Sequence, residues 1–377
     1  GGSMAHRNTF TKTEIDRLHD LIQEKQNTYG KEGQKRLRDR MRSIGFYISD
    51  YPKVRDFGVG DFNHLIRSGL VKVIDSESPE TLPRTEDRFE EEGISWNWCQ
   101  ENSDTLLSCG INQLLESDKH SWGEVHTDGP GVYLFSDDSK HLYIGESLII
   151  GNRVHQHCEG GTRSTFLKNL ADHLGVAKES DAIAELLNEV RSTIDIQALW
   201  VDIGRKELEE FGIVNLPTIL NRFHKGKRRK VTFNCVDESI WDTVQDFAIE
   251  LIEQGASVFE KLPQSKWLEA KPSDKAGLYK VLHEGELIYI GESTNIAERY
   301  KAHSNTTYFS ALRRSVGTKL FGFEYVGKKK FQDRDDNTIT SYLLECEYSW
   351  LSVAFGRREL EEYLIGSLQP SLNSKSK

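Results

Sequence analysis

The chain has 377 residues, of which 29% are charged and 37% hydrophobic, and its formal net charge is -10. This length is too great for one ordinary hydrophobic core and suits two or three domains. No apolar run approaches the roughly 18 residues needed to span a bilayer, so we expect a soluble, cytoplasmic protein with no membrane partner. Gly1-Gly2-Ser3 resemble the remnant of an expression vector, and the natural chain is expected to begin at Met4.

The cysteine pattern favours a reducing compartment. Five cysteines are scattered along the chain, and none has the spacing of a zinc-binding pair: Cys99, Cys109, Cys158, Cys235 and Cys346. An odd number at irregular spacing is not typical of a secreted disulfide framework. We therefore expect no disulfide-linked partner.

Charge is unevenly distributed along this acidic chain. Between Asp75 and Glu92, eight acidic residues are accompanied only by Arg84 and Arg88, which predicts a solvated linker or loop. Basic residues gather in three clusters: Lys31, Lys35, Arg36, Arg38, Arg40 and Arg42; Arg222, Lys225, Lys227, Arg228, Arg229 and Lys230; and Lys328, Lys329 and Lys330. Each cluster is either a solvated helix face or a local basic surface, which an acidic protein can carry for nucleic acid.

Residues 5–125 are predicted to form a mainly helical N-terminal domain. Thr11 and Glu14 form a capping-box pattern ahead of an apolar periodic stretch, so a helix begins there. A basic helix is expected over residues 32–44, followed by a short amphipathic helix and by a strand or hairpin at residues 70–74. The domain is either a DNA-recognition module or a partner-docking domain.

The rest of the chain contains an internal repeat, which decides how the sequence divides into domains. The first copy has Gly131-Val132-Tyr133, Tyr143-Ile144-Gly145-Glu146, Arg153 and His157. The second copy has, at the same spacings, Gly277-Leu278-Tyr279, Tyr289-Ile290-Gly291-Glu292, Arg299 and His303. Residues 204–211 recur as 356–363 and contain Glu209 and Glu361. Each copy ends on a proline and an asparagine: Pro217 with Asn221, and Pro370 with Asn373.

Local patterns assign these residues to strands and helices. Two runs of β-forming residues, 131–135 and 141–144, flank a polar segment and predict a hairpin. Residues 150–157 predict a helix on which the arginine and the histidine, four apart, share one face. The second copy has the same pattern. The later Glu-rich stretch is again helical, with an apolar stripe beside Glu361: Leu360, Leu364, Ile365 and Leu368.

This order of motifs resembles the GIY-YIG nuclease superfamily, whose members share a small α/β (α+β) domain with a three-stranded antiparallel sheet between helices. The resemblance implies a first nuclease domain at residues 126–224 and a second at residues 271–377, joined by a basic and helical insert at 225–270. The second copy has the whole pattern. In the first, Gly212 replaces the leucine after the glutamate, and the interval from Pro217 to Asn221 is one residue longer.

The resemblance implies a role for each repeated residue. The tyrosines of the first motif would act as base or positioner of the attacking water: Tyr133 and Tyr279. Proton transfer would be supported by Tyr143, Tyr289, His157 and His303. The phosphorane would be stabilised by Arg153 and Arg299, and one Mg²⁺ or Mn²⁺ per site would be held by Glu209 and Glu361. Substrate binding is expected at Asn221, Asn373 and the insert residues Lys227, Arg228 and Arg229.

These side-chain types suit phosphodiester hydrolysis. One carboxylate can hold a hard divalent cation that retains several waters and binds a phosphate oxygen. A guanidinium can stabilise, through two hydrogen bonds, the charge that builds on the phosphorane. A phenol whose ordinary pKa is near 10 needs a nearby positive field to act as a base at neutral pH.

Both copies depart from the family at the residue after YIG, where many members have lysine and this chain has Glu146 and Glu292. A carboxylate beside the phenol would raise the pKa of the phenol. Three roles stay open for these glutamates: a solvent-exposed side chain, a proton acceptor or a metal contact.

We therefore expect a metal-dependent endonuclease that cuts double-stranded DNA, of the restriction type and either site-specific or modification-sensitive. Because one chain holds both copies, a monomer could act as a pseudo-dimer with one site for each strand. Two alternatives stay open: a structure-specific repair or recombination nuclease, and a DNA-binding protein in which one or both nuclease folds are inactive. The intact Tyr, Arg, His and Glu residues of both copies argue against the last.

Overall fold

The computed structural model describes residues 6–28, 30–51, 57–74, 93–121, 130–138, 140–148, 150–159, 164–176, 180–190, 192–221, 231, 235 and 237–373. The chain divides into two compact units. Unit 1 contains Gly1–Trp98 and Asn102–Ala248, and unit 2 contains Cys99–Glu101 and Ile249–Lys377. The chain therefore enters unit 2 twice, once for three residues and once for the rest. Among the helices in these ranges, none has the length and apolar character that crossing a membrane requires.

The N-terminal part of unit 1 is mainly helical, as predicted. Its elements are β1 (Thr9–Thr11), α1 (Lys12–Asn27), α2 (Lys31–Ile44), η1 (Ile48–Asp50), α3 (Val59–Arg67) and β2 (Lys72–Ile74). The predicted capping box is present at the start of α1, where Thr11 Oγ1 accepts from the Glu14 amide and Glu14 Oε1 accepts from the Thr11 amide. Strands β1 and β2 pair in parallel, and the core beneath them includes Phe10, Leu18 and Phe46.

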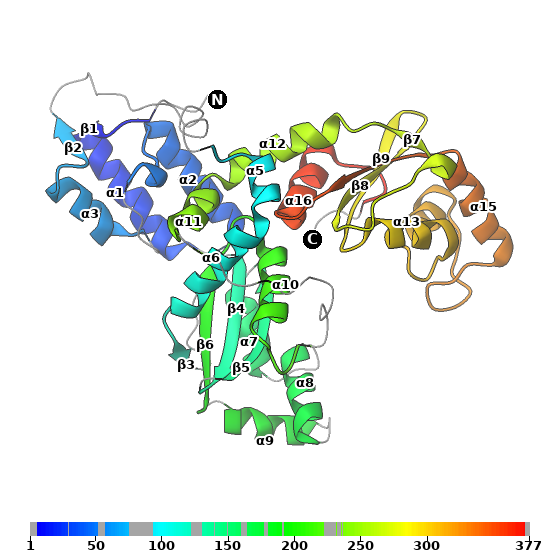
Figure 1. Ribbon diagram of the computed structural model, residues 1–377, viewed down its shortest axis with the longest axis horizontal. Coiled ribbons are helices and arrows are strands. Elements are labelled where there is room, and N and C mark those ends of the chain that lie inside the picture. The colour runs from blue at the N-terminus through cyan, green and yellow to red at the C-terminus, as the bar shows by residue number, and fades with distance from the viewer. Residues whose placement is uncertain are drawn as a thin grey trace. The chain divides into compact units, whose positions relative to one another are not determined.

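The rest of unit 1 is a sheet flanked by helices (Figure 1). Its elements are α5 (Trp96–Glu101), α6 (Ser103–Glu116), β3 (His120–Ser121), β4 (Gly131–Asp137), β5 (Lys140–Ser147), α7 (Ile150–Glu159), α8 (Thr165–Leu174), α9 (Ser180–Val190), β6 (Ile194–Trp200), α10 (Arg205–Asn215) and α11 (Ser239–Asp246). The strands run antiparallel in the order β3-β6-β4-β5. Of α5, residues 99–101 belong to unit 2.

Unit 2 is also a sheet flanked by helices. Its elements are α12 (Ala248–Glu260), β7 (Ser265–Lys266), η2 (Trp267–Glu269), β8 (Gly277–His283), β9 (Glu286–Ser293), α13 (Ile296–Asn305), α14 (Ala311–Ser315), the π-helix η3 (Val316–Leu320), α15 (Asp333–Leu344), β10 (Glu347–Ser352) and α16 (Arg357–Leu368). The strands run antiparallel in the order β7-β10-β8-β9.

The two sheets have the same order and the same register. Tyr133 pairs with Gly145 in unit 1, Tyr279 pairs with Gly291 in unit 2, and both hairpins shift register two residues after the tyrosine. Successive strand residues point to opposite faces of a sheet. Tyr133 therefore shares one face with Phe135, which packs against α7 and α8 in the hydrophobic core. In unit 1 the other face is covered by α6 and α10.

The structure differs from the sequence expectations in some details. Each sheet has a fourth, two-residue edge strand, β3 or β7, which no periodicity could reveal in so short a segment. Within the insert that was expected to be basic and helical, residues 239–246 and 248–260 form two helices, α11 and α12. A disulfide joins Cys109 to Cys235, which lie 126 residues apart, so the scattered pattern of cysteines did not exclude a bond within the chain. The acidic stretch at 75–92 lies outside the described residues.

Candidate active site

The tyrosine of the first motif lies on the central strand of each sheet and is almost fully buried, with 1% of Tyr133 and 2% of Tyr279 exposed. Each hydroxyl lies against the glycine of the second motif on the neighbouring strand. A Cβ atom on Gly145 or Gly291 would overlap the tyrosine oxygen. The residue at this position must therefore be glycine, because any side chain would displace the phenol.

In unit 1 the phenol is the first member of a Tyr–His–Ser chain. The Tyr133 hydroxyl lies 2.9 Å from His157 Nε2, and His157 Nδ1 lies 2.7 Å from Ser164 Oγ. Ser164 is the N-cap of α8, where its Oγ also accepts from the Leu167 amide. The helix start thus fixes the serine, and the serine orients the imidazole.

Unit 2 repeats this chain atom for atom. The Tyr279 hydroxyl lies 2.6 Å from His303 Nε2, and His303 Nδ1 lies 2.5 Å from Ser310 Oγ. Ser310 caps α14 by accepting from the Arg313 amide. The tyrosine and histidine were predicted from the sequence. The serines were missed, although each lies seven residues after its histidine in both copies.

Burial determines the protonation states of the tyrosine and the histidine in each Tyr–His–Ser chain. It lowers the pKa of His157 and His303 to about 3, with further contributions from Arg153 and Arg299. It also raises the pKa of Tyr133 and Tyr279 well above the ordinary value. Near neutral pH each histidine is therefore a neutral imidazole and each phenol keeps its proton.

The tyrosine of the second motif and the glutamate of the later helix form the other side of each site. Burial first, and then Glu209, raises the pKa of Tyr143 to about 12. The pKa of Tyr289 is raised by burial and by Glu361. Arg153 and Arg299 act in the opposite direction on these two phenols. The structure thus brings the predicted Tyr, Tyr, Arg, His and Glu together in each unit.

Each later helix carries a partly buried glutamate at the repeated position, Glu209 on α10 and Glu361 on α16. Glu209 on α10 accepts a hydrogen bond from Lys206 Nζ at 2.9 Å, and Glu361 on α16 lies 3.7 Å from Arg358 Nη1. Burial raises the pKa of both carboxyls to about 7. The side chains keep 12% and 14% exposure, so each is an accessible oxygen donor.

The glutamate after YIG is held by a buried arginine in each unit, so it does not simply project into solvent. In unit 1, Arg205 Nε donates to Glu146 Oε2 at 2.5 Å. In unit 2, Arg357 Nε donates to Glu292 Oε2 at 2.8 Å. Both arginines are 1% exposed. One oxygen of each glutamate is therefore bound to protein. The arginines were not among the predicted site residues, although they belong to the repeated 204–211 and 356–363 stretches.

Residues 267–377 match the family model described as the GIY-YIG catalytic domain. This segment is similar to that family and is referred to as the GIY-YIG domain. A domain of this family indicates a nuclease. The matched segment lies in unit 2 and includes Tyr279, Tyr289, Arg299, His303 and Glu361. No curated protein and no solved structure matches the chain.

The arginine that the GIY-YIG resemblance assigns to phosphate lies on the helix after the hairpin. In the GIY-YIG domain, Arg299 is partly exposed and its Nη1 donates to the Phe309 carbonyl at 3.1 Å. In unit 1, Arg153 Nη1 donates to Gln156 Oε1 at 3.0 Å. Neither contact joins the arginine to a carboxylate, so both guanidinium groups can turn to an anion.

The terminal asparagines hold the YIG strand by its backbone. Asn373 Oδ1 accepts from the Ile290 amide at 2.9 Å, and Asn373 Nδ2 donates to the Ile290 carbonyl at 2.8 Å. Asn221 makes the same two contacts with Ile144, each at 2.9 Å. Both amides are thus engaged with an edge strand. This arrangement supports positioning of β5 and β9 rather than the expected contact with substrate.

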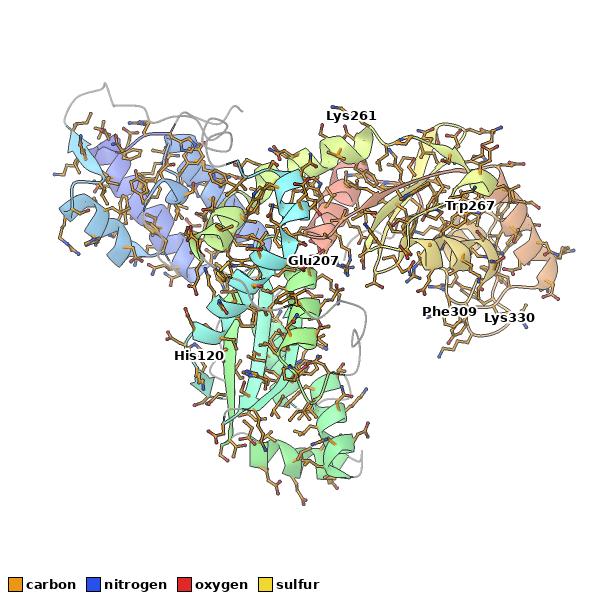
Figure 2. All side chains as sticks on the ribbon, in the orientation of Figure 1. His120, Glu207, Lys261, Trp267, Phe309 and Lys330 are labelled. Atoms are coloured by element: carbon orange, nitrogen blue, oxygen red, sulfur yellow. A yellow bond between two sulfur atoms is a disulfide. The ribbon has the colours of Figure 1, made fainter. Side chains whose placement is uncertain are left out.

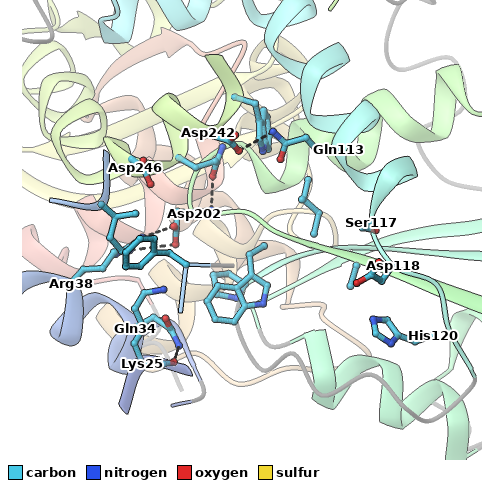
Figure 3. A pocket seen from close by; sticks show the side chains of 18 residues that line it. Lys25, Gln34, Arg38, Gln113, Ser117, Asp118, His120, Asp202, Asp242 and Asp246 are labelled. Atoms are coloured by element: carbon cyan, nitrogen blue, oxygen red, sulfur yellow. Dashed lines mark hydrogen bonds and ion pairs between the residues drawn. The ribbon is translucent and has the colours of Figure 1, made fainter. Parts of the chain in front are cut away.

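Of the expected basic clusters, the structure describes Arg38 and Arg42 of the N-terminal one but not the cluster from Arg222 to Lys230. Lys227, Arg228 and Arg229 lie outside the described residues. In the N-terminal cluster, Arg38 pairs with Asp202 at 2.5 Å and Arg42 Nη2 donates to the Asp246 carbonyl at 2.7 Å, so these two cations hold α2 against the rest of unit 1. Figure 3 shows the Arg38–Asp202 pair at the wall of a cavity of about 330 Å³.

Proposed function

We propose that this chain is a metal-dependent endonuclease with two nuclease sites, one in each unit, and that it cuts both strands of double-stranded DNA as a restriction or defence enzyme. The observation that carries the proposal is the duplicated site. Each unit has the same Tyr–His–Ser chain, with distances that differ by no more than 0.3 Å. Each also has the same Arg–Glu pair beside a partly buried glutamate.

The Tyr–His–Ser chain provides a path for a proton from the attacking water. With Nδ1–H of His303 bonded to Ser310, the free Nε2 can accept the proton of the Tyr279 hydroxyl. The phenol oxygen then takes a proton from the water as the water attacks phosphorus. The buried imidazole disfavours a positive charge on its own, so this transfer requires the negative charge that develops on the phosphate. The same account applies to Tyr133, His157 and Ser164.

The arginines stabilise the negative charge that develops on the phosphate. Arg299 and Arg153 lie close enough to the tyrosine pairs to lower the pKa of those phenols against the effect of burial. A guanidinium can donate two hydrogen bonds to the phosphoryl oxygens as their charge increases. Among the described residues, the hydrogen bond that holds Arg299 goes to the Phe309 carbonyl, so Arg299 can reach phosphate without breaking a buried ion pair.

The residues fit a hydrated divalent cation held by few protein ligands. Across the described part of the chain, no cluster of three or more His, Cys, Asp or Glu side chains could hold a metal. A single accessible carboxylate suits Mg²⁺, which keeps several waters, and does not suit zinc, which takes three or four protein ligands. Glu209 and Glu361 are the side chains that would hold it. The cation would polarise a phosphoryl oxygen and add positive field beside the phenol.

The GIY-YIG domain also has a surface suited to a nucleic acid. Phe309 is 65% exposed and Tyr308 is 42% exposed, and the Phe309 ring projects away from the fold (Figure 2). The Lys329 ammonium lies 5.6 Å from the Tyr308 ring, and Arg314 Nη1 donates to the Tyr308 carbonyl. Exposed aromatic rings beside cations can contact bases while the cations bind phosphates. The Arg299–Phe309 contact connects this surface to the site.

The experiment that tests the proposed function is digestion by the full chain of modified plasmid, unmodified plasmid and a branched oligonucleotide, each with Mg²⁺ and with excess chelator. We expect plasmid cleavage that requires Mg²⁺. Equal cleavage in chelator would overturn the metal requirement. Cleavage of the branched substrate alone would replace the restriction role by a repair role, and binding without cleavage would leave a DNA-binding protein.

A further inference from the structure

The repeat extends further upstream than the catalytic motifs. Trp96, Gln100 and Gly110 recur as Trp241, Gln245 and Gly255, with the same intervals of four and ten residues. In both copies the tryptophan and glutamine lie on a short helix, α5 or α11, and the glycine lies on the next helix, α6 or α12. Each repeat therefore starts with a helix pair ahead of its nuclease sheet.

In unit 1, Gln245 binds the loop that leads into α10. Its Oε1 accepts from the amides of Asp202 at 2.7 Å and Ile203 at 3.1 Å, and its Nε2 donates to the Ile203 carbonyl at 2.9 Å. The next residue, Gly204, has φ 91°, a left-handed conformation that favours glycine. One side-chain amide thus forms hydrogen bonds with three backbone groups of a loop that lies between a strand and a helix, where regular secondary structure does not provide these hydrogen bonds.

In unit 2, Gln100 makes the same three contacts with the loop that leads into α16. Its Oε1 accepts from the amides of Ala354 at 2.8 Å and Phe355 at 3.0 Å, and its Nε2 donates to the Phe355 carbonyl at 2.9 Å. Gly356 follows with φ 88°. Gln100 is one of only three residues of its region that belong to unit 2.

The two glutamines are exchanged between the repeats. By sequence, Gln245 belongs to the second repeat, but it binds the loop before α10 of the first repeat. Gln100 belongs to the first repeat, but it binds the loop before α16 of the second repeat. We infer that Gln100 and Gln245 are reciprocal positioning residues, through which each repeat completes the nuclease site of the other. The effect of the glutamines on catalysis rests on the proposed function. The exchange of contacts between the repeats does not depend on the proposed function.

The loop that each glutamine holds determines where two site residues lie. In unit 1 it is followed directly by Arg205, which binds Glu146, and one turn later by Glu209 on the same face of α10. In unit 2 it is followed by Arg357 and Glu361. Removing the glutamine leaves three backbone groups without this partner, so the helix start can shift and move the carboxylate away from its productive position.

The test uses the full chain with one site silenced at a time. With Glu209→Gln, only the second site can act. There Gln100→Ala should lower kcat by about tenfold or more with KM little changed, and Gln245→Ala should leave kcat within about twofold. With Glu361→Gln the two glutamine substitutions should exchange their effects. Gln34→Ala is the matched control, because Gln34 is a buried amide that donates to the Lys25 and Thr28 carbonyls of the N-terminal part.

Amide hydrogen exchange gives a readout that does not need nuclease activity. Gln100→Ala should speed exchange at Ala354 and Phe355 and leave Asp202 and Ile203 unchanged, and Gln245→Ala should do the reverse. If each glutamine affected the site of its own repeat, both in kcat and in amide hydrogen exchange, the inferred exchange of contacts between the repeats would be overturned. If hydrogen exchange followed the predicted pattern but both silenced backgrounds were inactive, the proposed two-site nuclease would fail and the exchanged contacts would stand.

Discussion

The Nε atom of Arg357 donates a hydrogen bond to Oε2 of Glu292 at 2.8 Å, in the same geometry as Arg205 and Glu146 of unit 1. A buried cation therefore neutralises the carboxylate that this chain carries where many GIY-YIG proteins have lysine. The pair also sets the field at Glu361, because Glu292 raises the pKa of that carboxyl and Arg357 lowers it.

Replacing Glu292 by Gln should move the acidic limb of the activity profile to lower pH. Burial and then Glu292 raise the pKa of Glu361 to about 7, and only the ionised carboxylate can hold a cation. Activity of the second site should therefore rise with pH toward 7, and removing the negative neighbour lowers the pKa of Glu361. The measurement is kcat/KM against pH with the first site silenced by Glu209→Gln. A limb that stays in place or moves to higher pH would contradict this coupling.

Arg357→Met should destabilise the GIY-YIG domain by about 3 kcal/mol, because it leaves the Glu292 carboxylate without its buried partner. The double variant Arg357→Met with Glu292→Gln should recover much of the loss, since neither charge then remains. Urea unfolding of the unchanged chain, the two single variants and the double variant measures both effects. A double variant that is as unstable as the sum of the two single variants would show that the ion pair is not the cause.

Arg299→Ala should lower the rate of the second site by two or more orders of magnitude, because loss of one transition-state donor commonly costs ~3 kcal/mol. Affinity for DNA should change little, since the guanidinium acts mainly on charge that develops during the reaction. Single-turnover cleavage and a binding titration separate the two quantities. An unchanged turnover would remove Arg299 from the site.

Phe309→Ala should weaken DNA binding by about tenfold, because the variant loses an exposed ring that can insert between base steps of a duplex, where a contact between an aromatic ring and a base contributes ~1–3 kcal/mol. Leu268→Ala is the control, since Leu268 is 77% exposed in the same unit but lies outside the aromatic and basic surface. Fluorescence titration of a labelled duplex measures both variants. Equal affinities for Phe309→Ala and the unchanged chain would exclude this surface from the DNA contact.

The sequence was sufficient to predict both hairpins and the helices that follow them. The structure also brings the Tyr, Arg, His and Glu of each repeat together, because fixed spacings on regular elements place these residues side by side. The sequence was not sufficient for Ser310, Arg357 or Gln100. Ser310 acts as a helix cap, and Arg357 was indistinguishable from a solvated charge in a Glu-rich helix. Gln100 acts at a distance of over 250 residues in sequence, which no local pattern encodes. Asn373 was assigned to substrate because its tertiary contact with Ile290 could not be foreseen.

We propose that each unit hydrolyses one strand of the DNA, and the strand-resolved products of the two single-site variants test this proposal. With either Glu209→Ala or Glu361→Ala, supercoiled plasmid should be converted to nicked circles and no further, while DNA binding is retained. Mapping by primer extension should find the nick on opposite strands in the two variants. If one variant were inactive and the other still produced linear plasmid, a single site would cut both strands, and the other unit would not hydrolyse DNA.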